Sequence, residues 1–113
     1  MGKYYSFRPT DHLEKTNIAQ DFAYRLRSMI PYHLRVFLVG SVANLRDRVY
    51  SDIDLRIVYS PQYGDVSIFK YLVNDLAQKM YLETGVWIDA KVRENTSSIA
   101  HGRSFFNRKA IEV

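Results

Sequence analysis

Helix-like and strand-like patterns of apolar residues alternate along this chain, and that alternation constrains the fold more than any other feature of the sequence. Thr10 or Asp11 can cap a first helix, with Asp11 and Glu14 at capping-box spacing, and Pro31 should end it. Its apolar residues recur at helical intervals: Ile18, Phe22, Leu26, Met29 and Ile30. A second apolar stripe predicts a helix from about Val66 to Leu82 and comprises Phe69, Leu72, Val73, Leu76 and Met80.

Three other segments have the composition of β-strands. They are residues 33–39, which stop at Gly40-Ser41, residues 52–59, in which polar and apolar residues alternate, and residues 86–92. A turn and a short helix should follow Gly40-Ser41, residues 60–65 should form a loop, and a basic helix is expected from about Ser97 to Lys109. In this order the elements predict an α/β (α+β) fold, with a small mixed sheet of at least three strands flanked by helices.

The length and composition indicate one ordinary globular domain, residues 1–113. A chain of 113 residues with 47% hydrophobic and 25% charged residues can bury a single core. The absence of cysteine excludes disulfides, zinc held by cysteine and thiol catalysis. Because no apolar stretch has the length of a signal peptide or a membrane span, we expect a soluble cytoplasmic protein. A net charge of +4 and a pI near 9.4 favour anionic ligands.

Two aspartates on the second predicted strand are the first candidates for chemistry. Asp52 and Asp54 are two residues apart, so both side chains project from the face opposite Ile53 and Leu55. Paired carboxylates repel unless a cation lies between them, and an oxygen-only site suits Mg²⁺. Taken alone, so short a pattern more often marks an exposed acidic strand edge.

The upstream turn and a third aspartate strengthen the metal interpretation. Gly40-Ser41 ends a buried strand, where glycine permits close backbone approach and the serine hydroxyl and nearby amides can bind phosphate oxygens. Asp89 lies in the last predicted strand; if this strand lies beside residues 52–59, three carboxylates meet in a site for two metal ions. The alternative for Asp89 is a salt bridge, with Lys91, Arg56 or Arg93 as its partner.

These residues together carry a family resemblance. The segment FLVGSVANLRDRVYSDIDLRIV resembles the signature of the DNA polymerase beta superfamily of nucleotidyltransferases, particularly its minimal nucleotidyltransferase branch. The resemblance implies the nucleotidyltransferase fold, a triphosphate held by Gly40 and Ser41, and two Mg²⁺ ions, replaceable by Mn²⁺, coordinated by Asp52 and Asp54. Asp89 resembles the third carboxylate, which binds the catalytic metal and activates the acceptor hydroxyl.

One further position and one departure from the pattern matter for nucleotide binding. Arg48 occupies a place where minimal members often carry arginine, so it could contact phosphate, although an exposed turn arginine is equally compatible with simple solvation. Where such proteins commonly show an Ala-Arg-Gly run, this chain has Asn44-Leu45 after Ala43, which loses a charge and backbone flexibility. The metal ligands are all retained.

The resemblance implies an enzyme that transfers a nucleotidyl group, expected to be AMP from ATP, to an acceptor. Stand-alone proteins of this type often adenylylate a helical HEPN-type toxin, so we expect an antitoxin role and a homodimer or heterocomplex. A different interpretation is a catalytically inactive nucleotide-binding interaction module. A third is a basic nucleic-acid-binding domain, with Arg103, Arg108 and Lys109 as contacts, which is not favoured because no aromatic or recognition-helix signature accompanies them.

Overall fold

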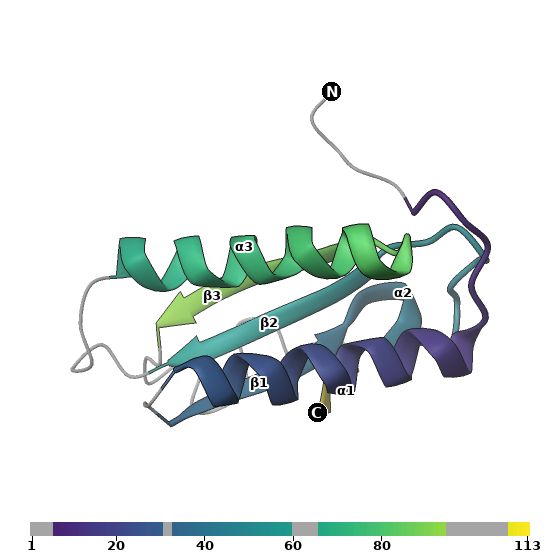
Figure 1. Cartoon of the computed structure of the whole chain (residues 1–113). Helices are drawn as coiled ribbons and strands as arrows, with labels where there is room; N and C mark the ends of the chain where they lie inside the picture. Colours follow the sequence, from purple (N-terminus) through teal and green to yellow (C-terminus); the bar gives the residue numbers. More distant parts are fainter. Residues whose placement is uncertain (1–5, 31–32, 60–65, 95–108) are drawn as a thin grey trace.

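The structure of the protein is a computed structural model, which describes residues 6–30, 33–59, 66–94 and 109–113. Its elements, in chain order, are α1 (His12–Met29), β1 (Leu34–Val39), α2 (Gly40–Ala43), β2 (Ile53–Tyr59), α3 (Val66–Thr84), β3 (Ile88–Glu94) and β4 (Ile111–Glu112). The strands form one mixed sheet in the order β3-β2-β1-β4, in which β2 is parallel to β3 and antiparallel to β1. Helices α1 and α3 lie side by side on one face of this sheet (Figure 1). The predicted mixed sheet flanked by helices is therefore confirmed.

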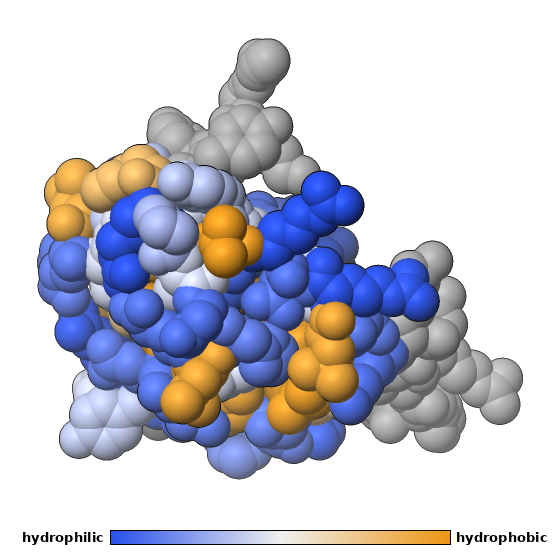
Figure 2. Space-filling model, turned by 90° about the vertical axis from the view of Figure 1, so that its right-hand side faces the viewer, coloured by the Kyte–Doolittle hydropathy of each residue, from blue (hydrophilic) through white to orange (hydrophobic). Residues whose placement is uncertain are grey.

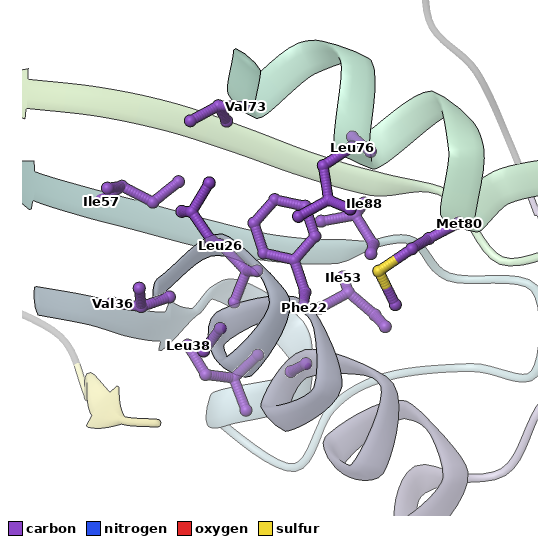
Figure 3. Packing of buried hydrophobic residues seen from close by; sticks show 14 of the residues in the cluster. Phe22, Leu26, Val36, Leu38, Ile53, Ile57, Val73, Leu76, Met80 and Ile88 are labelled. Carbon is purple, nitrogen blue, oxygen red and sulfur yellow. The ribbon is translucent and has the colours of Figure 1, made fainter. Parts of the chain in front are cut away.

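The main core lies between the two helices and the sheet. Alternation along β2 turns Ile53, Leu55 and Ile57 toward the helices, and all three are 0% exposed. Figure 3 shows how side chains of both helices meet side chains of the three long strands; those it labels are Phe22, Leu26, Val36, Leu38, Ile53, Ile57, Val73, Leu76, Met80 and Ile88. Since Ile53 and Leu55 are held in this core, Asp54 between them must project from the opposite face.

Most differences from the sequence-based boundaries are small. β2 begins one residue after Asp52, β3 begins at Ile88 rather than at residue 86, and α3 continues to Thr84. Met29, expected in the apolar stripe, is 42% exposed because it is the last residue of α1. The expected loop 60–65 lies outside the described residues, as does the expected basic helix except for Lys109, which is in no helix. Among the described helices, none is long and apolar enough to cross a membrane.

A buried lysine ties α1 to the loop between α2 and β2. Asp11 caps the helix as predicted, accepting a hydrogen bond of 2.8 Å from the Glu14 amide. One turn further on, Lys15 is fully buried, and its Nζ donates to the Thr10 carbonyl at 3.0 Å, to Asp47 Oδ2 at 3.2 Å and to the Arg48 carbonyl. All three ammonium protons therefore have acceptors, as a buried charge requires.

The second partner of Asp47 comes from the first turn of α1. His12 Nδ1 lies 2.8 Å from Asp47 Oδ1, and the Asp47 side chain is nearly buried. Burial favours the neutral form of Asp47, but the hydrogen bonds with His12 and Lys15 outweigh burial and lower its pKa. The loop that leads into Asp52 is thus fixed to α1 by an ion pair and by backbone acceptors.

Replacing the buried lysine should destabilise the fold strongly. Lys15→Met leaves Asp47 without its buried cation, so we expect the free energy of unfolding to fall by about 3 kcal/mol. Lys79→Met is the matched control, because Lys79 pairs with Asp75 at 3.3 Å on the surface, with 66% of its side chain exposed, and should cost no more than about 0.5 kcal/mol. Urea unfolding followed by circular dichroism measures both; equal losses would contradict the role of Lys15.

Candidate metal and phosphate site

Three carboxylates meet at one end of the sheet, on the face opposite the helices. In the parallel β2–β3 ladder Asp54 is the direct partner of Asp89, and Asp52 immediately precedes β2. One carboxylate oxygen from each of the three residues lies within 4.8 Å of the other two, and all three residues are half-buried. The structure therefore brings together the three aspartates that the sequence singled out.

Local sequence explains this convergence. Asp89 is flanked by Ile88, which is buried in the main core, and by Ala90, which packs against that core, so the alternation of β3 turns Asp89 to the same side as Asp54. The parallel register then places the two side chains next to each other across the ladder. Two acidic residues as direct neighbours are unfavourable in an ordinary sheet, which indicates that the pair serves a purpose other than stability.

The donor set fits a hard divalent cation. Within the described residues Asp89 makes no ion pair with Arg56, Lys91 or Arg93, so the salt bridge considered as an alternative is not found. Three carboxylates this close together repel one another unless a cation lies between them. Oxygen ligands, few in number and half-exposed, suit Mg²⁺ or Mn²⁺, which keep water and phosphate oxygens as further ligands.

Gly40 is required where the backbone passes the carboxylate of Asp54. Val39, the last residue of β1, is the register partner of Asp54, and Gly40 follows it with φ +72°. A Cβ atom at Gly40 would lie 2.3 Å from Asp54 Oδ2, far inside van der Waals contact. Both the left-handed backbone and the missing side chain are therefore needed to seat the carboxylate against the turn.

A hollow of about 530 Å³ opens beside this turn and is lined by Gly40, Ser41, Asn44 and Arg46. The turn is held by hydrogen bonds of 2.8 Å from the Arg46 amide to the Ser41 carbonyl and from Asn44 Nδ2 to the Gly40 carbonyl. Figure 1 places α2 and the starts of β2 and β3 at the same end of the sheet. Figure 2 shows the surface at that end, which is mostly hydrophilic, with its apolar side chains in separate spots.

The departure at Asn44-Leu45 leaves the turn intact. Leu45 adopts φ +58°, a left-handed conformation that glycine would adopt without steric cost, and its side chain is exposed. The backbone thus keeps a glycine-like shape in spite of the leucine. Arg46 brings a positive charge to the hollow beside Asn44. As one arginine among several in this loop, Arg46 had no sequence signal that would single it out for this place.

Arg48 lies elsewhere. It lines a different hollow, together with Thr10, His12 and Asp47 from the network around Lys15. Its backbone N–H donates a hydrogen bond of 2.9 Å to Ser51 Oγ. Contact between Arg48 and phosphate therefore stays a prediction. His12 in the same hollow pairs with Asp47.

Comparison with known proteins supports the fold. No family model matches the sequence, and no curated protein matches it significantly. The structure is similar to the 1.40 Å crystal structure of a Sulfolobus solfataricus protein described as a "putative nucleotidyltransferase". The two share 20% sequence identity over 89% of this chain and 84% of that chain, with a TM-score of 0.59. At this identity the likeness establishes a shared, nucleotidyltransferase-like fold and nothing about activity.

Adding a side chain at Gly40 should disable the carboxylate site while leaving a folded protein. We expect Mg²⁺ with a nucleoside triphosphate to raise the melting temperature of the wild type by binding the native state. Gly40→Ala should displace Asp54 and abolish that rise. Gly85→Ala is the control, since Gly85 also has a left-handed φ of +76°, but its added Cβ would meet the side chains of Phe7 and Arg8. Each variant should lose about 1–2 kcal/mol from backbone strain. A ligand-induced shift retained in Gly40→Ala would contradict this account of the turn.

Proposed function

We propose that this protein is a metal-dependent nucleotidyltransferase. The observation that carries the proposal is the convergence of Asp52, Asp54 and Asp89, with Asp54 directly against the Gly40 turn, beside a hollow with Ser41 and Arg46 on its wall. Nucleotidyl transfer needs such a pairing, because a triphosphate must be held next to cations that stabilise the charge of an in-line displacement.

Each residue has a distinct task in the proposed reaction. Asp52, Asp54 and Asp89 would hold two Mg²⁺ ions, which when bound lower the pKa of the acceptor hydroxyl and stabilise the charge on the phosphates. Ser41 and the amides of the turn hold the β- and γ-phosphates, and Arg46, in the same hollow as Ser41, compensates their charge. The acceptor hydroxyl releases its proton to solvent as its oxygen forms a bond to the α-phosphorus. The bond from that phosphorus to the bridging oxygen breaks, and pyrophosphate leaves with the pair of electrons.

The nucleotide and acceptor are further parts of the proposal. We propose ATP as the donor and a protein as the acceptor, in line with the resemblance to minimal nucleotidyltransferases that modify a helical HEPN-type toxin. This would make the protein an antitoxin that works in a heterocomplex, or as a homodimer when its partner is absent. A basic protein with a pI near 9.4 suits the anionic donor.

Neutralising the strand pair should separate activity from stability. We expect Asp52→Asn with Asp54→Asn to lower transfer from α-labelled ATP by roughly 10³-fold, since lost metal ligation removes several kcal/mol of transition-state stabilisation. Without metal the double variant should melt at the same temperature as the wild type or higher, because two repelling charges are removed. Retained transfer would refute the assignment, and nucleotide binding without transfer in the wild type would instead identify a binding module.

Two arginines can be compared directly for the phosphate role. Arg46→Gln removes the cation from the hollow beside Ser41 and should raise the KM for ATP about tenfold, as expected for the loss of one charge-assisted hydrogen bond. Arg48→Gln removes the same charge from the other hollow and should change KM by less than about twofold. A larger effect at Arg48 than at Arg46 would favour the sequence-based assignment over the geometry.

A further inference from the structure

The order of groups across the sheet determines the side from which an acceptor must approach. Asp54 lies between Gly40, which it touches, and Asp89, its partner on β3. In-line displacement places the attacking and leaving oxygens on opposite sides of the phosphorus. If pyrophosphate leaves on the Gly40 side, as the proposed function requires, the acceptor hydroxyl arrives on the side of Asp89, over β3. Within the described part of the sheet β3 is the outermost strand at that edge.

A second hollow lies along this edge, between α3 and β3, with a volume of about 260 Å³. Its exposed rim carries Lys70 and Asn74 from α3 and Lys91 and Arg93 from β3, and its floor is apolar, formed by Val73, Ala90 and Val92. Lys91 is two residues beyond Asp89 on the same strand, about 7 Å further along. The hollow is therefore next to the carboxylate site without being part of it.

The three rim cations differ from half of the other basic residues that the structure describes. Arg8, Arg25, Arg35, Lys15 and Lys79 each make an ion pair with an acidic side chain. Lys70, Lys91 and Arg93 make none with any described residue, and all three are exposed. Three positive charges around one hollow, none of them paired within the described residues, produce a local potential that attracts an anionic ligand.

The composition of the hollow favours a peptide over a nucleic acid. Proteins that hold single-stranded nucleic acids stack the bases on aromatic side chains, and no described residue on this wall is aromatic. The floor instead offers small aliphatic side chains, which suit an apolar residue of a peptide. In addition, the outer edge of β3 has no strand partner among the described residues, so its backbone groups can pair with an extended chain.

We propose that this edge docks an extended acidic segment of the protein acceptor. The segment pairs with the backbone of β3, places an apolar side chain on the floor at Val73 and Val92, and directs carboxylates to Lys91 and Arg93. The residue two positions along the segment from the one that meets Lys91 then lies beside Asp89, because neighbouring strands have the same repeat. A hydroxyl-bearing residue at that position reaches Asp89. The surface selects the acceptor, and this inference rests on the proposed function for the direction of approach and for the protein nature of the acceptor.

Binding can be measured separately from catalysis. The probe is a fluorescein-labelled random copolymer of glutamate and tyrosine, which offers acidic, extended and hydroxyl-bearing segments, followed by fluorescence anisotropy without ATP or metal. Lys91→Gln with Arg93→Gln should weaken binding about tenfold, the equivalent of two partly exposed charge contacts. The control, Lys79→Gln with Lys109→Gln, removes the same charge from exposed positions that do not line the hollow and should stay within about twofold of the wild type.

Two further measurements distinguish the docking surface from the proposed function and from nucleic-acid binding. The wild type should transfer AMP to the copolymer in the presence of Mg²⁺ and ATP, so a wild-type protein that binds the copolymer but never transfers refutes the proposed function and leaves the docking surface standing. Labelled oligouridylate tests a nucleic-acid ligand. Equal binding of the copolymer by the rim variant and its control, no binding by the wild type, or tighter binding of oligouridylate that depends on Lys91 and Arg93 would each overturn the docking of an acidic peptide.

Discussion

The contact between the Asp54 carboxylate and the Gly40 backbone is the constraint on which the site depends. Asp54 cannot turn inward, because Ile53 and Leu55 on either side of it are fully buried against the helices. It must therefore project from the other face, where the register with Val39 brings it against the residue that follows β1. Only glycine leaves room there. The hydrophobic alternation of one central strand and a single glycine thus set the distance between carboxylate and turn.

The site is built from groups that repel one another, and other parts of the fold compensate. Asp52, Asp54 and Asp89 place three like charges within 4.8 Å, an arrangement that lowers the stability of the protein when no cation is present. The main core and the Lys15–Asp47 pair hold the flanking strands and the loop before Asp52 in place regardless of metal. A rigid frame of this kind pre-organises the carboxylates, so that little ordering is needed when ligand binds.

Sequence patterns predicted the parts of the molecule that repeat over many residues. The two long helices and the strands ending at Val39 and Tyr59 were predicted because their apolar periodicity extends over several turns or alternations. Strand β4 was missed because two residues, Ile111 and Glu112, are too few to show a period. The buried lysine left a signal that could have been recognised: Lys15 is three residues before Ile18 and therefore on the apolar face of α1.

The carboxylate triad could be predicted, whereas the cations around it could not. The spacing of Asp52 and Asp54 limits them to one side of a strand. Asp89 comes next to Asp54 once β2 and β3 pair in parallel. Basic side chains are long and most of them lie on the surface, so sequence does not separate Arg46 in the hollow from Arg48 outside it. The hollow between α3 and β3 likewise depends on how a helix packs on an edge strand, which no local pattern encodes.

The most direct test of the central claim is an anomalous-scattering experiment on crystals grown with Mn²⁺ and a non-hydrolysable ATP analogue. Manganese replaces Mg²⁺ at oxygen-ligand sites and scatters anomalously, so it reports the position of the cations independently of any assay. We expect anomalous peaks among the carboxylates of Asp52, Asp54 and Asp89, with the triphosphate against Gly40 and Ser41. Manganese or nucleotide bound only elsewhere on the protein, with no metal at Asp52, Asp54 and Asp89, would contradict the account.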